Sequence, residues 1–147
     1  VLRAEKGYVI VGQDTDGSVT PIDLGMDWIV SKKKDFIGKR SLFRADTARD
    51  NRKQLVGLKT EDSTFVLPEG AQLVNGVSSS RPVPMVGHVT SSYFSATLGR
   101  SIALALIKGG RARLGGTVYA PLMDGQLIKA TITEPVFYDP DNLRQRE

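Results

Sequence analysis

The chain has 147 residues, 40% of them hydrophobic and 24% charged, which fits one globular domain, alone or with part of a neighbouring domain. It contains no cysteine and one histidine, which excludes disulfides, thiolate catalysis and metal sites built from cysteine or several histidines. The formal charge is +4, but the basic residues are scattered among 16 acids, so no nucleic-acid partner is expected. No apolar run approaches the roughly 20 residues of a transmembrane helix. The chain does not start with the charged-then-apolar order of a signal peptide. We expect no membrane partner and a cytoplasmic location.

The first fifty residues give a mixed pattern. GYVIVG, residues 7–12, is typical of a short strand, and the turn formers that follow predict a loop to residue 21. Residues 22–31 suggest a second extended or buried segment anchored by Trp28. The spacing of apolar residues then changes and predicts a helix over 38–48, followed by a polar linker over 47–53.

After residue 53 the pattern is that of β-structure. Pro68-Glu69-Gly70 marks a turn, 77–84 a loop, and Asp124-Gly125 a hairpin. The glycine-rich stretch 109–116 is interpreted as a barrel connection, because it does not match GxxxxGK[ST]. Strand-like runs cover 54–61, 71–75, 85–92, 101–108, 116–123 and 126–133. This spacing predicts a small barrel or sandwich. The fold class is therefore α+β and mostly β, with a β/α region over 1–50 and an all-β domain over 51–147.

Two isolated polar features of the sequence do not indicate a metal or catalytic site. Asp14 and Asp16, in DTDG, resemble the start of a calcium loop, but the twelfth position counted from Asp14 is Gly25 instead of glutamate. We interpret both aspartates as residues of a solvated turn. His88, in MVGHVTSS, lies in a strand-like run without a nucleophile elbow and is interpreted as structural.

Several ordered anchors resemble one family over the whole chain. LRAEKGYVIVGQD, a Thr-Pro pair, a tryptophan and KKKDFIGKRSL resemble the pattern LRxExGxxxxGxDxD…TP…W…DFIGxxAL. LVGLKTED, GHVTSSYFSATLGRSIALALIKGG and ATITEPVFYDP continue that resemblance. The pattern is that of the second half of the folate-dependent aminomethyltransferase family, which includes the T-protein of the glycine cleavage system. The resemblance implies the end of a folate-binding α/β domain over 1–50, followed by the family's C-terminal antiparallel β-barrel domain over 51–147.

Within this family, the stretch from GHVTSS to KGG and the ending PVFYDPDN most resemble the α subunits of heterotetrameric sarcosine oxidases. That branch implies an enzyme that demethylates sarcosine to glycine, yielding hydrogen peroxide and either formaldehyde or 5,10-methylenetetrahydrofolate. It also implies β, γ and δ partner subunits. No GxGxxG fingerprint is present, so FAD, FMN and NAD are expected outside this sequence.

The resemblance assigns roles to three residues. The family's glutamate of LRxExG, which binds the pterin ring of tetrahydrofolate, corresponds to Glu5. A carboxylate suits this role because it accepts two parallel N–H bonds. The basic residue near the folate carboxylates corresponds to Lys34, or to Lys33 if the loop shifts. Tyr138 stands where relatives carry an aromatic residue near the folate. The family's catalytic aspartate belongs to its N-terminal half, so no catalytic residue is assigned here and this stretch alone is expected to be inactive.

Alternatives remain open. The chain could belong to a glycine cleavage T-protein or a dimethylglycine dehydrogenase relative, with the same folate pocket and another one-carbon donor. It could also be a noncatalytic assembly module of a large oxidase. Oligonucleotide binding by the barrel is the least favoured alternative, because no basic stripe with interleaved aromatic residues is present. We expect the first ~45 residues to be less well ordered than the barrel, or covered by a second copy, because an unpaired apolar strand tends to associate.

Overall fold

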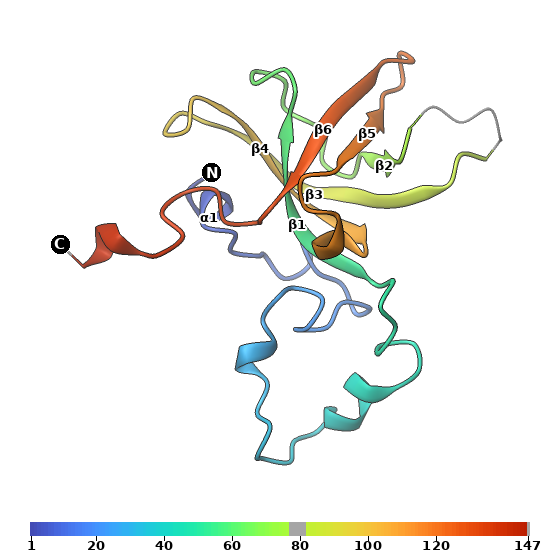
Figure 1. The fold of residues 1–147 in the computed structure, drawn as a ribbon, viewed down its shortest axis with the longest axis vertical. Coiled ribbons are helices and arrows are strands. Elements are labelled where there is room, and N and C mark those ends of the chain that lie inside the picture. The colour runs from blue at the N-terminus through green and yellow to red at the C-terminus, as the bar shows by residue number, and fades with distance from the viewer. Residues whose placement is uncertain (77–81, 147) are drawn as a thin grey trace.

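The computed structural model describes residues 1–76 and 82–146, and in it six antiparallel strands close into a barrel (Figure 1). Around the barrel the order is β1-β4-β3-β2-β5-β6, and β1 pairs with β6 to close it. The strands are β1 (Lys53–Thr60), β2 (Gln72–Val74), β3 (Met85–Ser95), β4 (Arg100–Lys108), β5 (Thr117–Pro121) and β6 (Leu127–Thr133). The expected class, mostly β with few helices, is confirmed.

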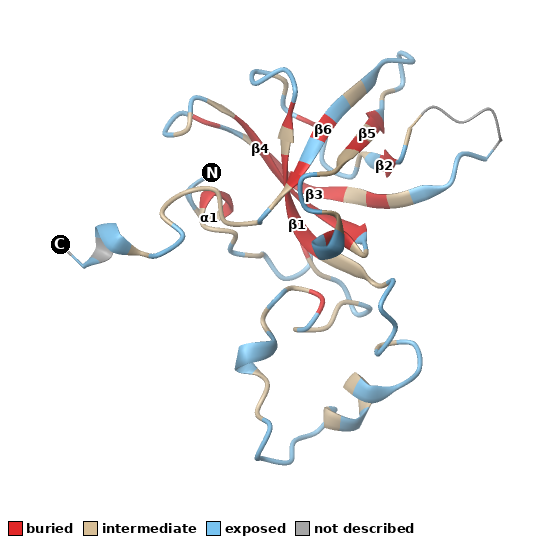
Figure 2. Ribbon diagram, viewed as in Figure 1, coloured by how far each residue is buried: buried red, intermediate tan, exposed pale blue. Residues whose placement is uncertain are grey.

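Two hydrophobic clusters explain why the strands of the barrel are so apolar (Figure 2). The first fills the barrel and contains residues of every strand, such as Val56, Val89 and Ile107. The second lies on the outer face of β1 and β4 and contains Leu55 and Leu104. Because β4 is covered on both faces, its sequence SIALALI shows a continuous apolar run instead of an alternation.

The connections of the barrel agree with the sequence. The 3-10 helix η3 (Gly110–Arg113) joins β4 to β5, so the glycine-rich stretch is a connection. The hairpin between β5 and β6 turns at Gly125, whose φ of +86° is a conformation that glycine adopts without strain. A last 3-10 helix, η4 (Leu143–Gln145), follows β6. Of the loop expected over 77–84, residues 77–81 lie outside the described part of the chain.

The region before the barrel departs from the predictions. Residues 7–12 form no strand: they lie between Gly7 and Gly12, which both have positive φ, and make one bridge, from Val11 to Thr15. These glycines turn the chain twice within six residues, which prevents an extended ladder. The region starts with one helical turn, α1 (Leu2–Glu5).

The predicted helix and the predicted anchor of this region are also wrong. Instead of a helix over 38–48, a 3-10 helix, η2 (Lys39–Phe43), follows Gly38, whose φ is +92°. Trp28 lies in a second short 3-10 helix, η1 (Asp27–Ile29), and its side chain is 78% exposed. The apolar spacing of residues 28–43 therefore does not mark a core within this chain.

Asp14 fixes the N-terminal region to the outer face of β3. Its side chain is completely buried, so the prediction of a solvated turn is wrong for this residue. Its Oδ1 accepts hydrogen bonds from the hydroxyls of Thr90 (2.5 Å) and Ser91 (2.6 Å). Its Oδ2 accepts bonds from the Arg3 guanidinium (2.6 Å) and the Ile10 amide (2.8 Å). Burial alone would raise the pKa of Asp14, but these four donors outweigh it and lower the pKa.

A β-bulge places the two hydroxyls together. Val89 pairs with Ala105 and Ser91 with Leu104, so Thr90 is an extra residue in β3. A bulge of this kind turns two successive side chains toward one side of a sheet. Without it, the hydroxyls of Thr90 and Ser91 would point to opposite faces of the strand, and one oxygen of Asp14 would lose a donor.

A second buried carboxylate fixes the chain just before the barrel. Asp23 receives bonds from Arg52 Nε (2.9 Å) and Nη2 (2.7 Å) and from the Thr20 amide (2.8 Å). Burial would raise the pKa of Asp23, and the bonds from Arg52 and Thr20 lower it instead. The backbone of Asp23 accepts the amide of Leu55 at 2.9 Å, which fixes this segment beside β1.

Gly87 of β3 is expected to tolerate no side chain. A Cβ at this position would overlap the carbonyl oxygen of Leu106 and lie 2.9 Å from the Cα of Ile107, and both belong to the backbone of β4. We expect Gly87→Ala to lower the free energy of unfolding by about 1–3 kcal/mol, the usual cost of overpacking. Urea denaturation measures this loss. Gly17→Ala is the matched control, since a Cβ there meets no atom within 4 Å; equal midpoints for the two variants would contradict the packing at Gly87.

Asp14 is expected to make stability fall in acid. Its pKa is lower in the folded chain than its ordinary value of 3.8. Its stabilisation is therefore complete above that value and is lost as the pH falls through the folded-state pKa. Asp14→Asn should cost roughly 1.5–3 kcal/mol at pH 7, as expected for lost bonds to a charged group, and should flatten this acid loss. Thermal unfolding between pH 2.5 and pH 7 tests both effects. Asp16→Asn changes an exposed residue two positions away and should have little effect; a similar loss in both variants would argue against the role of Asp14.

Candidate functional site

Glu5 is a buried carboxylate at the end of α1, and its side chain is 3% exposed. The Ser95 hydroxyl donates a 2.5 Å hydrogen bond to its Oε1. Within residues 1–76 and 82–146, no donor reaches Oε2. Glu5 is not a surface glutamate paired with the neighbouring Arg3 or Lys6, because Arg3 pairs with Asp14 and Lys6 with Asp139. Glu5 thus keeps one acceptor oxygen for a further donor.

The backbone around Glu5 is held by the chain that follows β6. The amides of Phe137 and Tyr138 donate to the carbonyl oxygen of Glu5 at 2.8 and 3.0 Å. Gly7 turns with a φ of +70°, and a Cβ there would lie 2.8 Å from the carbonyl oxygen of Pro135. The glycine two residues after Glu5 is therefore required both by its backbone conformation and by the close approach of residues 135–138. These contacts make the position of the Glu5 carboxylate rigid.

Ser95 is a site residue that the sequence analysis did not single out. Its hydroxyl donates to Glu5 and accepts the amide of Leu98 at 3.1 Å, and its side chain is completely buried. Ser95 ends β3, the strand that also supplies Thr90 and Ser91 to Asp14. The stretch VTSSYFS contains a signal for this role: four serine or threonine side chains in a strand that is mostly buried. Buried hydroxyls usually have polar partners, and three of these four do, whereas the Ser92 hydroxyl has none among the described residues.

Tyr138 lies next to Glu5 through its backbone. Its amide bonds the Glu5 carbonyl, while its half-buried ring lies under the Arg144 guanidinium, 5.6 Å from the ring centroid. The structure thus brings two of the three sequence-predicted residues together at the end of α1.

Lys34 is not part of this group. It is exposed and lies between η1 and η2, in the loop that Figure 1 shows far from α1. There it lines an open hollow together with Trp28, Lys32 and Lys33. Its amide donates to the Ser31 hydroxyl at 3.0 Å, and its carbonyl accepts from Lys39. For Lys34 and Glu5 to contact the same ligand, that ligand would have to span the distance from α1 to the loop between η1 and η2.

The chemistry of the Glu5 group is that of recognition. A buried carboxylate whose Oε2 has no donor among the described residues can accept a charge-assisted N–H bond from a ligand. Within the described part of the chain, no three residues of the metal-binding types come together as a metal site. No helix in that part is both long and apolar enough to cross a membrane.

Comparisons with known proteins agree with this architecture. The model of the family "Glycine cleavage T-protein C-terminal barrel domain" matches residues 53–139, which contain all six strands. In three dimensions the chain is similar to the glycine cleavage system aminomethyltransferase T from Bartonella henselae, with a TM-score of 0.76 and 26% sequence identity. That match covers 95% of this chain and 37% of the other.

Two groups of curated proteins are similar in sequence. Sarcosine oxidase subunit alpha from Corynebacterium sp. (strain U-96) is 52% identical over 99% of this chain, which spans 15% of that protein. Aminomethyltransferase from Thermotoga petrophila is 34% identical over 94% of this chain, which spans 35% of that protein. Both the family resemblance and its sarcosine oxidase branch, expected from the motifs, are confirmed. The chain belongs to the family of the glycine cleavage T-protein C-terminal barrel domain.

Proposed function

We propose that this chain is the folate-binding, aminomethyltransferase-like portion of a sarcosine oxidase α subunit. The observation that carries the proposal is Glu5: a buried carboxylate with one oxygen held by Ser95 and the other without a donor among the described residues. The similarity to sarcosine oxidase subunit alpha and to aminomethyltransferases supports the choice of ligand class.

Tetrahydrofolate fits the acceptor that Glu5 offers. Its aminopyrimidine edge presents N–H donors side by side, and a charge-assisted pair to a carboxylate is stronger than a neutral one. Bound folate supplies the nitrogens that take up a one-carbon unit. The residues of this chain orient the ring: Glu5 accepts its donors, Ser95 fixes the carboxylate, and the backbone of Tyr138 holds the end of α1. Lys34 would meet the folate carboxylates as a point charge.

The oxidation of sarcosine belongs, in this proposal, to parts of a longer protein. FAD, FMN and NAD would be bound there or in the β, γ and δ subunits, and the complex would be cytoplasmic. The products would be glycine, hydrogen peroxide and either formaldehyde or 5,10-methylenetetrahydrofolate. The catalytic carboxylate would also lie elsewhere. Residues 1–50 would complete the folate-binding domain, and 51–147 would form the barrel domain packed against it.

Glu5→Gln is expected to weaken folate binding. The change keeps the size of the side chain but replaces one acceptor oxygen with an NH2 group, which opposes the ligand's donors. We expect a loss of about 1–3 kcal/mol, as for a hydrogen-bond partner removed from a buried site. Calorimetric titration of the chain with 5-formyltetrahydrofolate measures it.

Glu61→Gln provides the control for this titration. Glu61 is 68% exposed and pairs with Lys129, so its change removes the same charge away from α1. Near-ultraviolet circular dichroism checks that both variants fold. If the unaltered chain binds folate and the two variants bind it equally well, the assignment of Glu5 is wrong. Repeating the titration on an N-terminally longer protein shows whether further residues are needed.

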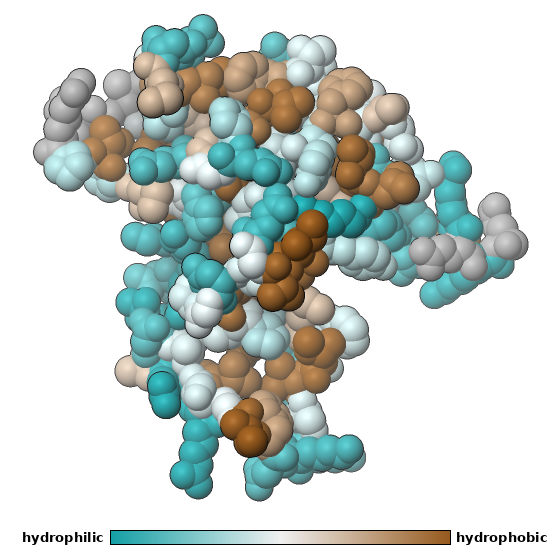
Figure 3. All heavy atoms as spheres, turned by 180° about the vertical axis from the view of Figure 1, so that it is seen from behind, coloured by the Kyte–Doolittle hydropathy of each residue, from teal (hydrophilic) through white to brown (hydrophobic). Residues whose placement is uncertain are grey.

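A second role in assembly is favoured by the apolar side chains of the N-terminal region. Trp28, Ile37 and Phe43 are 78%, 105% and 74% exposed, and Tyr8 and Val11 are also exposed. In Figure 3 hydrophobic residues appear on the surface of the part that lies below the barrel. Exposed apolar clusters of this kind mark contact surfaces. In this second proposal, residues 8–43 contact another part of a longer polypeptide or a partner subunit.

Hydrogen exchange tests whether this region depends on such a contact. Its backbone hydrogen bonds are mostly local turns, such as Met26 to Pro21 and Ile29 to Met26. We expect amides of residues 7–30 to exchange much faster than those of 85–107 in a dilute sample, because turns open without unfolding the barrel. Equal protection of the two stretches would contradict the proposal that this region needs a partner.

A further inference from the structure

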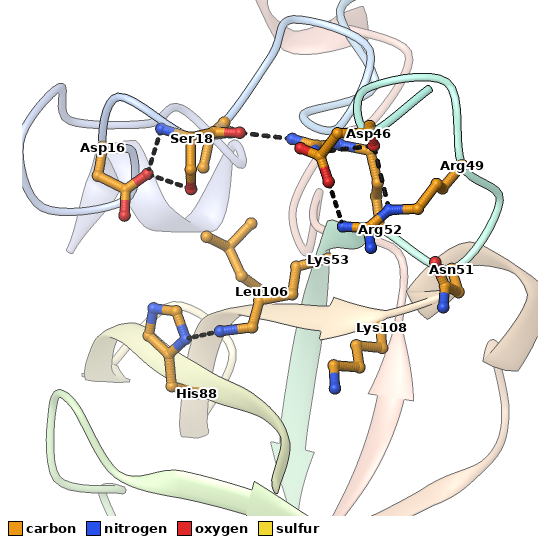
Figure 4. Close-up of a pocket in the computed structure, with 11 residues that line it drawn as sticks. Asp16, Ser18, Asp46, Arg49, Asn51, Arg52, Lys53, His88, Leu106 and Lys108 are labelled. Carbon is orange, nitrogen blue, oxygen red and sulfur yellow. Dashed lines mark hydrogen bonds and ion pairs between the residues drawn. The ribbon is translucent and has the colours of Figure 1, made fainter. Parts of the chain in front are cut away.

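A cavity of about 260 Å³ opens at one end of the outer face that β1, β3 and β4 share (Figure 4). Its floor consists of Lys53 of β1, Lys108 of β4 and His88 of β3, together with Leu106. Lys53 is the direct cross-strand partner of Lys108, and His88 is the partner of Leu106. Since directly opposed residues point to the same face, these four side chains line one side of the cavity. The loop around Ser18 and the stretch 46–52 form its other walls.

The two lysines are an unusual pair. Like charges directly opposite each other in a sheet are destabilising. The Nζ of Lys53 lies 3.3 Å from the Nδ1 of His88. Lys108 has no hydrogen bond or ion pair to any residue of the described ranges, and Figure 4 shows its amine without a contact to its neighbours. The floor of the cavity therefore holds two ammonium groups that form no ion pair with a carboxylate of the described residues.

The acids of the cavity are already engaged. Asp46 pairs with Arg49 at 2.7 Å and with Arg52 at 3.3 Å. Asp16 accepts the amide and the hydroxyl of Ser18 at 2.8 and 2.6 Å. Neither carboxylate forms an ion pair with Lys53 or Lys108 among the described residues, although the charge of Lys53 helps to lower the pKa of Asp16. The basic residues of the cavity therefore outnumber its acids.

His88 lies beside Lys53 at the edge of this floor. A lysine ammonium only donates, so the contact from Lys53 makes Nδ1 the acceptor and leaves the proton on Nε2. Burial, and after it the charge of Lys53, lowers the pKa of His88. Figure 4 shows Nε2 on the side of the ring away from Lys53 and Lys108, so the histidine borders the lysine pair without adding a third donor to it.

We propose that this cavity is a binding site for a small oxyanion, the phosphate or carboxylate group of a metabolite, held by Lys53 and Lys108 next to His88. An anion between the two lysines removes their repulsion and makes charge-assisted bonds to both. The volume of about 260 Å³ suits such a group and is below the usual range for larger ligands. The site uses none of the residues proposed for folate.

The single histidine of the chain makes a direct test possible. The imidazole NMR signal of His88 is followed at pH 7.5 and constant ionic strength, while inorganic phosphate or succinate replaces chloride. We expect a saturable shift with at least one of the two anions. Saturation with phosphate alone identifies a phosphate site, and saturation with succinate alone a carboxylate site. A chemical shift that changes linearly with the concentration of both anions would overturn the proposal. The cavity would then be a contact site for an acidic side chain of another polypeptide.

Lysine variants locate the binding. Lys108→Gln should weaken the anion about tenfold, because it removes a charged donor from the site. Lys129→Gln, which removes the same charge from β6 outside the cavity, should leave the affinity unchanged. Lys53→Gln provides a second variant of the floor if Lys108→Gln does not fold. Equal affinities in Lys108→Gln and Lys129→Gln would assign the shift to bulk charge and refute the site.

Discussion

The burial of the Asp14 carboxylate is the interaction on which the rest of this structure depends. Moving a carboxylate out of water costs several kcal/mol unless its oxygens are satisfied. Here two hydroxyls of β3, the Arg3 guanidinium and the Ile10 amide satisfy it. These four donors come from three separate parts of the chain. The desolvation cost of Asp14 is therefore offset only when the N-terminal region and the barrel have both taken up their native arrangement.

This arrangement determines which faces of the barrel are apolar. With the N-terminal region fixed by Asp14 and Asp23, Ala4, Val19 and Leu24 pack on the outer face of β1 and β4. The same docking brings α1 to the end of β3, where Ser95 reaches Glu5. The position of Glu5 is therefore a consequence of the packing that makes the outer face of the barrel apolar, and a change at Asp14 would affect Glu5 without touching it.

The sequence predicted the barrel and failed before it, for one physical reason. The strands from Lys53 to Thr133 bury their apolar residues within the chain, so hydrophobic runs bounded by glycine and proline located them correctly. In residues 7–43 several large apolar side chains face outward, so the same pattern predicted a strand and a helix that do not exist. Glu5, Tyr138 and Lys34 were predicted from the family resemblance. In the structure Tyr138 is adjacent to Glu5, and Lys34 lies apart from them.

Polar residues were harder to place than apolar ones. A short polar side chain such as that of Asp14 looks the same in a sequence whether it is solvated or buried among donors. Its partners, Thr90 and Ser91, are more than seventy residues away and meet it only because a bulge turns both hydroxyls to one side. No local pattern encodes that encounter. The hydroxyl-rich stretch of β3 can be recognised in the sequence, but the burial of its acidic partners cannot.

The polar sites follow one another along β3. His88 lines the cationic cavity near the start of the strand, Thr90 and Ser91 bind Asp14 in the middle, and Ser95 binds Glu5 at the end. Seven residues of extended chain separate His88 from Ser95, a span of roughly 20 Å at about 3.3 Å per residue. A small oxyanion held by the lysines therefore cannot contact Glu5. Since the Asp14 group lies between them and joins the N-terminal region to the strand, a ligand at either end would stabilise the same docked arrangement, and each would favour the other only through that shared docking.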